Sequence, residues 1–257
     1  MTRIIAILNQ KGGVGKTTTT LNLGAALKQA GRRVLCVDMD PQGNLTQAFG
    51  VNKYDDNNKY IYDVMKEYVE AKDAILHLEG SDLIPCDIRF SGADIEFSSI
   101  VGREQILKER LNPIVDDYDY ILIDCPPALG VIALNALTFA TEVFTPLQTE
   151  FFALSGVAQL TRTIESTQRR VNHQLKLTGI IPTMHYAQKS LNKEVLEKIK
   201  DYFPGIVFNT CIRVNVALVE SPSQGKNIFQ YKPNSNGAKD YTALCKEVME
   251  QEAKINE

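Results

Sequence analysis

Residues 9–18 read NQKGGVGKTT, from Asn9 to Thr18, and this stretch decides the fold. It follows an apolar run at residues 3–8, which is typical of a buried strand, and it precedes a helical pattern over about residues 16–30. Glycines allow backbone conformations that a side chain forbids, so the amides of such a loop can point inward at phosphate oxygens. The stretch therefore predicts a phosphate-binding loop between a strand and a helix.

Apolar runs of strand length alternate with helix-length segments along most of the chain. Runs that are apolar throughout indicate a parallel sheet covered on both faces, and right-handed crossovers then give a doubly wound α/β fold. No repeat or linker divides the chain, so residues 1–257 are expected to form a single domain. Further strands are expected at 34–37, 83–84, 120–123, 142–146, 177–182 and 206–211, and further helices at 104–115, 131–140, 154–170, 192–202 and 238–250.

The composition excludes several classes of protein. With 44% hydrophobic and 23% charged residues, the chain can bury a core, which excludes a disordered or fibrous protein. No apolar run approaches the roughly 18 residues that cross a bilayer, and the first residues do not resemble a secretory signal. Five widely spaced cysteines without a C-x-x-C pattern argue against a disulfide framework and against a zinc site. We therefore expect a cytoplasmic protein.

The net charge of −3 hides an asymmetry along the chain. Residues 51–120 contain 16 acidic and 8 basic residues, whereas residues 185–246 contain 9 basic and 5 acidic residues. A basic region can face a polyanion even in an acidic protein, and an ordinary solvated surface is the alternative.

The loop departs from the usual phosphate-loop pattern G-x-x-x-x-G-K-[ST], because Gln10 stands where the first glycine is expected and a second lysine, Lys11, follows it. This deviant Walker motif resembles that of the ParA/Soj-type partition ATPases, in the MinD/ParA group of P-loop NTPases. The resemblance extends from residue 3 to about residue 248. Three further segments carry it: VDMDPQGN at 37–44, YILIDCPP at 120–127 and ESPSQGK at 220–226.

The resemblance implies ATP and Mg²⁺ as cofactors. Lys16 would reach the β- and γ-phosphates, and the Thr17 hydroxyl would ligate Mg²⁺. Lys11 would reach the nucleotide of the other subunit in a homodimer, which makes catalysis conditional on dimerisation; a solvated loop lysine is the alternative. The expected nucleotide-binding residues are Lys11, Gly12, Gly13, Val14, Gly15, Lys16, Thr17, Thr18, Met184, Arg213 and Asn215.

Two aspartates complete the implied site. Asp40 would orient the attacking water and join Lys11 and Lys16 as a catalytic residue, while its alternative is a helix cap before Leu45. Asp124 matches the Walker-B acid and would hold Mg²⁺ together with Thr17. The expected switch residues, which would respond to the γ-phosphate, are Pro41, Gln42, Gly43, Asn44, Pro126 and Pro127.

Other positions follow the family less closely. The adenine loop, I-P-R-N in relatives, is Ile212-Arg213-Val214-Asn215 here, so the asparagine is retained while the proline and the arginine are displaced or absent. Cys125 is a buried thiol or, as in the iron–sulfur reductase branch, a cluster ligand. Several arginines that bind DNA in relatives are absent, and lysine offers a point charge without the guanidinium fork. The candidate DNA-binding residues are Lys189, Lys193, Lys200, Arg213, Lys226 and Lys232.

The resemblance implies a dimerising ATPase that hydrolyses ATP slowly and binds DNA without sequence preference in the ATP state. With a ParB-like activator it would partition or position chromosome DNA, plasmid DNA or another cargo on the nucleoid. The alternatives are a positioning ATPase for a protein cargo, a MinD-like membrane-recruited division regulator, and a metabolic ligase or reductase on the same fold. The acidic segment 245–257 argues against a membrane partner.

Overall fold

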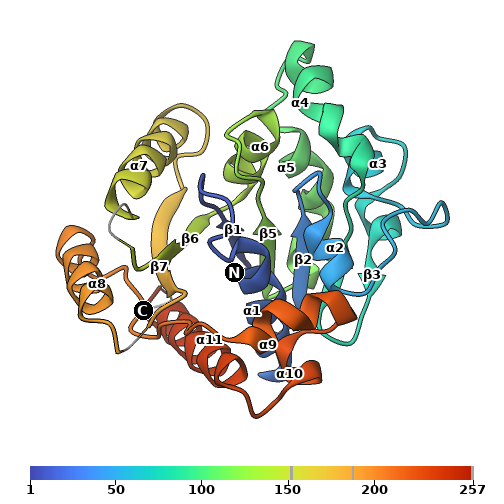
Figure 1. The fold of residues 1–257 in the computed structure, drawn as a ribbon. Coiled ribbons are helices and arrows are strands. Elements are labelled where there is room, and N and C mark those ends of the chain that lie inside the picture. The colour runs from blue at the N-terminus through green and yellow to red at the C-terminus, as the bar shows by residue number, and fades with distance from the viewer. Residues whose placement is uncertain (151–152, 187, 256–257) are drawn as a thin grey trace.

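The computed structural model describes residues 1–150, 153–186 and 188–255 (Figure 1). Across these residues the strands form one seven-stranded sheet in the order β3-β4-β2-β5-β1-β6-β7. All neighbouring strands are parallel except β3 and β4, which are antiparallel. The strands are β1 (Arg3–Ile7), β2 (Val34–Asp38), β3 (Leu76–His77), β4 (Asp82–Ile84), β5 (Tyr120–Asp124), β6 (Glu142–Gln148) and β7 (Lys176–Thr183).

Helices cover both faces of this sheet, which confirms the predicted doubly wound α/β fold (Figure 1). The α-helices are α1 (Lys16–Gln29), α2 (Asn44–Ala48), α3 (Ile61–Met65), α4 (Ala93–Glu96), α5 (Ile106–Leu111), α6 (Val131–Phe139), α7 (Ala153–Arg170), α8 (Ser190–Tyr202), α9 (Val216–Glu220), α10 (Ile228–Tyr231) and α11 (Asn236–Ile255). Short 3₁₀ helices lie at η1 (Ala71–Ala74), η2 (Ile88–Gly92), η3 (Phe97–Ser99), η4 (Asn112–Asp117) and η5 (Ser221–Gln224).

The alternation of side chains along each central strand produces two cores. In β1, Ile4 and Ala6 pack in the cluster that contains residues of α3, α5 and α6, whereas Ile5 and Ile7 pack with residues of α1, α10 and α11. Every residue of β1 is buried, which explains the unbroken apolar run in the sequence. The sheet is thereby held between two layers of helices, and the carboxyl ends of β2, β5 and β1 meet at one edge.

One predicted strand is wrong. Residues 206–211 form no strand, and Val207 makes only an isolated bridge to Ile180 of β7. The amides of Asn209 and Thr210 donate instead to the carboxylate of Glu247 on α11, at 2.8 and 2.7 Å. The Ile206 carbonyl and the Phe208 amide bond the Ile180 backbone of β7, but a side chain from another element takes the two amides that follow, so no regular strand forms.

The predicted helix at 104–115 also differs from the structure. It begins at Ile106 and gives way after Leu111 to the 3₁₀ helix η4, which contains Pro113 near its start. Within the described ranges, no helix combines the length and the apolar character needed to cross a membrane. All five cysteines are free thiols.

Candidate nucleotide site

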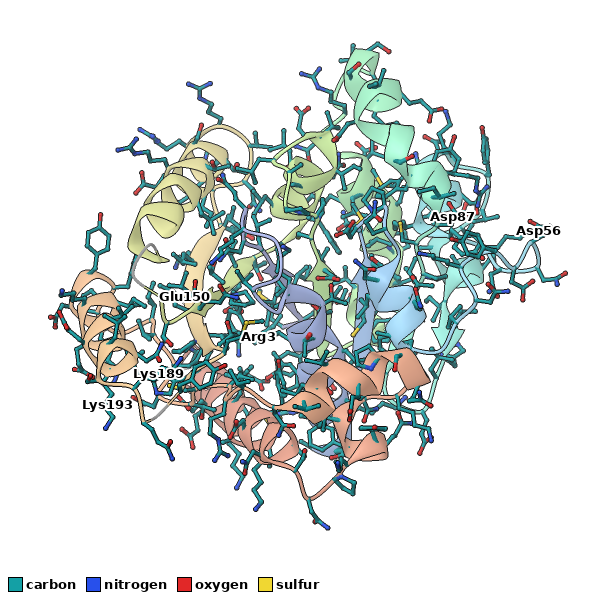
Figure 2. The ribbon with its side chains drawn as sticks, viewed as in Figure 1. Arg3, Asp56, Asp87, Glu150, Lys189 and Lys193 are labelled. Atoms are coloured by element: carbon teal, nitrogen blue, oxygen red, sulfur yellow. The ribbon has the colours of Figure 1, made fainter. Side chains whose placement is uncertain are left out.

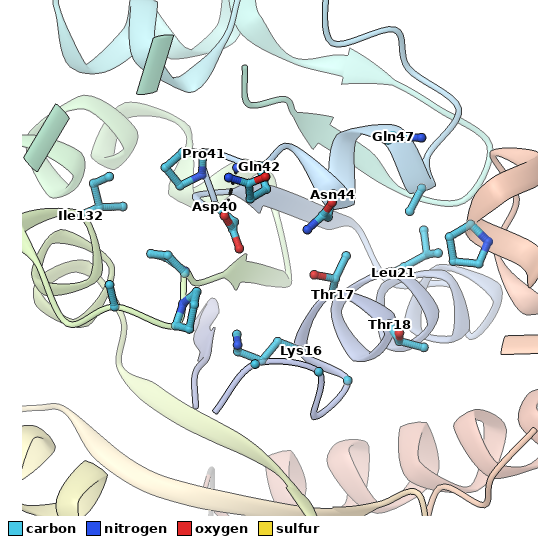
Figure 3. A pocket seen from close by; sticks show the side chains of 18 of the residues that line it. Lys16, Thr17, Thr18, Leu21, Asp40, Pro41, Gln42, Asn44, Gln47 and Ile132 are labelled. Carbon is cyan, nitrogen blue, oxygen red and sulfur yellow. Dashed lines mark hydrogen bonds between the residues drawn. The ribbon is translucent and has the colours of Figure 1, made fainter. Parts of the chain in front are cut away.

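A pocket of about 880 Å³ opens where the loops after β1, β2 and β5 meet (Figure 3). The structure therefore brings together three motifs that are far apart in the sequence. Of the predicted site residues, the pocket lining contains Gly12, Gly13, Gly15, Lys16, Thr17, Thr18, Asp40, Pro41, Gln42, Asn44, Pro126, Pro127 and Met184. Lys11, Val14, Gly43, Asp124, Arg213 and Asn215 lie outside this lining.

The phosphate loop uses glycine where the backbone requires it. Gly13 and Gly15 have φ angles of 72° and 95°, in the left-handed region that disfavours other residues. Gly15 is also the residue from which α1 begins, so the positive end of that helix faces the pocket. A Cβ atom added at Gly12 or Gly13 would meet nothing within 4 Å, which leaves open space against the loop for a phosphate group.

Side chains fasten this loop to the neighbouring strands. The Asn9 amide nitrogen donates to the Pro146 carbonyl at 2.8 Å, and its oxygen accepts from the Lys11 amide at 3.0 Å. On the other side, the Thr183 hydroxyl donates to the Val14 carbonyl at 2.9 Å. The loop conformation is therefore fixed by β6 and β7 as well as by its own glycines.

The two lysines of the loop point in different directions. Lys16 is buried, and its ammonium nitrogen lies 3.4 Å from the Lys11 carbonyl beside the pocket. The Lys11 side chain is 58% exposed, and its ammonium contacts Gln148 Oε1 at 2.6 Å and Glu150 Oε2 at 3.1 Å at the end of β6 (Figure 2 labels Glu150). Lys16 thus serves the pocket of its own chain, whereas Lys11 presents its charge at the rim.

Thr17, which lines the pocket, and Asp124, which is buried behind it, form an oxygen pair. The Thr17 hydroxyl donates to Asp124 Oδ2 at 2.7 Å, and Asp124 Oδ1 is buried without a hydrogen-bond partner. Burial and the nearby charge of Asp38 raise the pKa of Asp124 well above its ordinary value. A buried carboxylate oxygen with no donor, beside a hydroxyl, suits a divalent cation that prefers oxygen ligands. Mg²⁺ therefore fits the residues present.

Asp40 lies on the opposite wall of the pocket from the phosphate loop (Figure 3). Its Oδ1 atom accepts from the Gln42 amide at 3.0 Å, and its carbonyl accepts from Gly43. Helix α2 begins only after Gly43, and the Asp40 side chain bonds no amide of that helix. This geometry leaves the second carboxylate oxygen of Asp40 available to the pocket and does not support the helix-cap alternative.

Asp38 holds the loop that carries Asp40 in place. Its carboxylate is completely buried and accepts from the Thr46 amide, the Thr46 hydroxyl and the Asp40 amide, at 2.8, 2.7 and 3.2 Å. Burial raises the pKa of Asp38 to about 6. Asp38 therefore supports the loop that carries Asp40 through a specific set of hydrogen bonds.

Sequence reasoning missed part of the lining. Ser91 and Asp94 reach the pocket from η2 and α4, which no motif marked. Pro222 and Ser223 come from the ESPSQGK segment, which the resemblance singled out without giving it a role. Asp94 and Ser91 carried no signal in a single sequence, because their approach to the pocket depends on how α4 packs.

Comparison with known proteins agrees with this geometry. A family model described as an AAA domain matches residues 2–177. The chain is 46% identical over 250 residues to the sporulation initiation inhibitor protein Soj of Bacillus subtilis, and the match spans 96% of this chain and 98% of Soj. The chain belongs to the Soj/ParA family of P-loop ATPases. It is also 41% identical over 254 residues to the chromosome partitioning protein ParA of Caulobacter vibrioides, covering 97% of this chain and 95% of that protein.

Solved structures share the fold of this Soj/ParA ATPase. A cobyrinic acid a,c-diamide synthase from Mycobacterium smegmatis, with bound ATP analog and magnesium, has a TM-score of 0.84 at 37% identity and covers 97% of this chain and 95% of its own. The cell division ATPase MinD of Pyrococcus furiosus has a TM-score of 0.80 at 28% identity, covering 98% of this chain and all of its own. One fold thus serves proteins with different titles, so the fold alone assigns no cargo.

The predicted adenine contacts of the Soj/ParA chain are not all brought to the pocket. Met184 reaches it and accepts a hydrogen bond on its sulfur from Gln148. Arg213 is turned toward α11, where Asp240 accepts from its Nε and terminal nitrogen, at 3.1 and 2.6 Å. The Asn215 oxygen accepts from the Ala217 amide and caps α9. The roles of Arg213 and Asn215 toward a nucleotide stay predictions.

The candidate DNA-binding residues of the Soj/ParA chain fall into two groups. Lys189, Lys193 and Lys200 belong to the region of α8, with Lys189 and Lys193 exposed (Figure 2). Lys226 and Lys232 flank α10, and α11 lies between the two groups in Figure 1. Lys200 faces Glu197 at 3.5 Å, which reduces its free charge. The structure thus separates these residues instead of gathering them into one patch.

Proposed function

We propose that this chain is an ATP-dependent molecular switch that dimerises with ATP and Mg²⁺ bound, hydrolyses ATP slowly, and partitions or positions DNA or another cargo. The proposal depends on the different positions of the two loop lysines. Lys16 is buried beside the pocket, and Lys11 is exposed at its rim. Two relatives at 41% identity are named for chromosome partitioning.

The residues of one chain account for nucleotide binding. Loop amides and Lys16 hold the phosphate groups, and Thr17 with the unpartnered Oδ1 of Asp124 holds Mg²⁺. When bound, Mg²⁺ neutralises charge on the phosphate oxygens. Asp40 orients the attacking water with the carboxylate oxygen that Gln42 does not use. Catalysis by positioning is consistent with slow turnover, because no residue of the pocket lining is a strong base.

In the proposed dimer, a second copy of the chain supplies another positive charge to the pocket through its Lys11. Lys11 does not line its own pocket, and among the described residues its ammonium group contacts Gln148 and Glu150 at the rim. Exposed apolar side chains also occur at the pocket and close to it in the chain: Met184 lines the pocket, and Val216 and Val219, at 68% and 79% exposure, lie on α9 just before the pocket-lining Pro222 and Ser223. A face-to-face homodimer buries these side chains and brings Lys11 to the opposite nucleotide.

The nucleotide-loaded state gives the direct test. We expect Asp40→Ala to bind ATP and to double its mass in light scattering with ATP and Mg²⁺, because hydrolysis no longer ends the dimeric state. Lys16→Ala should bind no ATP and stay monomeric, since it loses the cation beside the phosphates. Lys11→Ala is the matched variant that keeps ATP binding but does not dimerise. A monomeric Asp40→Ala protein at high concentration with ATP bound would refute the switch.

We infer a cytoplasmic protein whose ATP-bound dimer binds DNA non-specifically and responds to a ParB-like activator, with plasmid DNA, chromosome DNA or a protein as cargo. The basic residues of α8 supply phosphate contacts without base recognition. A membrane role is disfavoured by how α11 is held. Its Glu252 accepts from Tyr120 and Arg32, and its Val248 carbonyl accepts from Arg3. A helix docked on the sheet in this way buries its apolar face: Tyr241, Leu244 and Val248 are buried, whereas Lys239, Lys246 and Glu250 are exposed.

A further inference from the structure

A segment behind the pocket touches both loops that the resemblance marks as switches. This connecting segment comprises residues 86–94: Cys86, Asp87, the 3₁₀ helix η2 and the start of α4. Its first residue contacts the loop after β2, and its last residue contacts the loop after β5. No motif assigned it a role.

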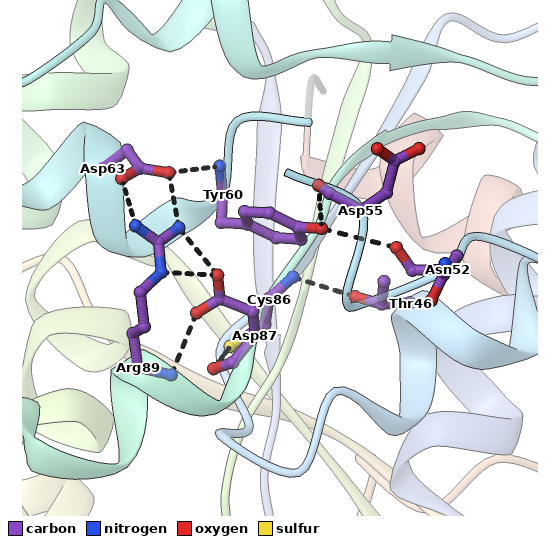
Figure 4. Close-up of polar contacts among 8 residues, drawn as sticks. All are labelled: Thr46, Asn52, Asp55, Tyr60, Asp63, Cys86, Asp87 and Arg89. Carbon is purple, nitrogen blue, oxygen red and sulfur yellow. Dashed lines mark hydrogen bonds and ion pairs between the residues drawn. The ribbon is translucent and has the colours of Figure 1, made fainter. Parts of the chain in front are cut away.

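The first contact runs through Thr46. The Cys86 amide donates to the Thr46 hydroxyl at 2.8 Å, and that hydroxyl donates to Asp38 at 2.7 Å (Figure 4 shows the Cys86–Thr46 bond). Asp38 in turn accepts from the Asp40 amide at 3.2 Å. The Cys86 carbonyl lies 3.0 Å from where a Cβ atom of Gly43 would be. The start of the connecting segment is thus in close contact with the loop that carries Asp40.

The second contact runs through Asp94. Its Oδ1 atom accepts from the Ile132 amide at 2.9 Å in the first turn of α6. A Cβ atom added at Gly130 would overlap the Asp94 carboxylate, so that carboxylate packs directly on the Gly130 backbone. Gly130 precedes α6 and offers no side-chain cap, so Asp94 supplies the cap from α4. The loop after Asp124 is thereby fixed at its far end.

The segment between these contacts is rigidly held. Phe90 and Ala93 are completely buried in the core. Both terminal nitrogens of Arg89 donate to Asp63 on α3 at 2.8 Å, and its Nε donates to Asp87 at 2.7 Å (Figure 4). This bidentate arrangement restricts the segment to one orientation. A displacement at one end is therefore transmitted to the other.

We propose that Thr46 and Asp94 are positioning residues for ATP hydrolysis, which the connecting segment couples to each other. The proposal rests on the proposed function, because it assumes that Asp40 and the loop after Asp124 act on one nucleotide. When the segment is intact, the two loops occupy their hydrolysis-competent positions together. Coupling means that a change in one loop affects the other loop, and the test therefore changes one loop and measures the effect at the other.

Amide hydrogen exchange on the nucleotide-free protein measures this directly. Thr46→Val removes the acceptor of the Cys86 amide, and we expect exchange at residues 131–134 to rise about tenfold, as for loss of a helix cap. Reciprocally, Asp94→Ala should raise exchange at residues 42–44. Thr46→Ser and Asp94→Asn keep the hydroxyl and the acceptor oxygen and should restore protection. Changes confined to the mutated side would overturn the coupling.

Kinetics separate this proposal from the proposed function. In steady-state ATP hydrolysis, Thr46→Val and Asp94→Ala should each lower kcat about tenfold with KM unchanged, and the double variant should lower it no further. Glu96→Gln is the control, because it removes a charge from α4 whose hydrogen bonds within the described residues go to Tyr62 and Lys66. Independent, multiplying effects would overturn the coupling. Absence of hydrolysis in the wild type would instead refute the proposed function and leave the exchange result valid.

Should Thr46→Val fail to fold, Arg89→Lys provides the second route. Lysine cannot make the bidentate contact with Asp63, so the connecting segment loosens as a whole. We expect exchange to rise at both loops together. A rise at neither loop, or at one alone, would overturn the proposal.

Discussion

At the scale of single residues, the site contains two buried carboxyl groups whose negative charge is unfavourable when no cation is bound. Asp38 and Asp124 lie on neighbouring strands at paired positions of the sheet, and both are completely or almost completely buried. Burial raises the pKa of each, which means that the folded protein without a ligand disfavours their charged forms. A cation held by Thr17 and Asp124 would relieve this cost, so the charge arrangement would favour the loaded state.

This arrangement predicts an unusual pH dependence of stability for the protein without nucleotide or Mg²⁺. The pKa of Asp38 rises from 3.8 in the unfolded chain to about 6 in the fold. Between these values the folded state binds more protons, so its stability falls as pH rises through 6. We expect Asp38 to make the protein more stable at pH 5 than at pH 7, by on the order of 1 kcal/mol. Denaturant unfolding of wild type and Asp38→Asn measures this, and equal pH slopes would contradict it.

At the scale of elements, the ESPSQGK segment is placed by a contact between two glycine backbones. Gly225 follows η5 with a φ of 62°, and a Cβ atom there would lie 2.5 Å from the Cα of Gly50, just after α2. This approach lets η5 pack on α2 and brings Pro222 and Ser223 to the pocket. The ESPSQGK segment therefore contains a glycine that allows close backbone packing, in addition to the residues that line the pocket.

Gly225→Ala tests this packing. We expect a loss of about 3 kcal/mol or more in the free energy of unfolding, because a left-handed alanine and a backbone overlap act together. The matched control is Gly205→Ala, since Gly205 has a φ of 79° but nothing within 4 Å of an added Cβ. That variant should lose only about 1–2 kcal/mol from the left-handed conformation. Equal losses in the two variants would show that the contact with Gly50 is unimportant.

At the scale of the whole molecule, charge is distributed unevenly between the two edges of the sheet. In Figure 2, Lys189 and Lys193 lie at the edge near α8, and Asp56 and Asp87 lie toward the opposite edge. Lys198 is paired with Glu194, whereas Lys189 and Lys193 are exposed. A polyanion is therefore expected to approach from the α8 side.

The single-domain organisation of residues 1–257 stays a prediction, and residues 256–257 lie outside the described ranges.

The proposed DNA binding predicts a measurable salt dependence. In the presence of ATP and Mg²⁺, each lysine lost from the contact should reduce the log–log slope of affinity against salt by about 0.9. We therefore expect Lys189→Ala with Lys193→Ala to reduce the slope by about 1.8 per subunit. Lys59→Ala, in the exposed loop near Asp56, is the control and should leave it unchanged. Equal slopes for both variants in a plasmid-binding titration would exclude α8 as the contact surface.

The sequence by itself determined the phosphate loop, the central parallel strands and the family. Each of these depends on residues that are adjacent in the chain, or on apolar runs whose burial follows from their composition. Lys16, Thr17 and Asp40 were identified because their motifs need particular residues at fixed spacing.

Only the tertiary structure decided how distant segments meet. Residues 206–211 have the composition of a strand, yet Glu247 takes the amides of Asn209 and Thr210 after Ile206 and Phe208 have bonded the β7 backbone. Asp94 reaches the pocket, and Arg213 turns away from it toward Asp240, because of how α4 and α11 pack. These contacts join residues that are far apart in the sequence, and the local propensities of a segment do not determine which of them form.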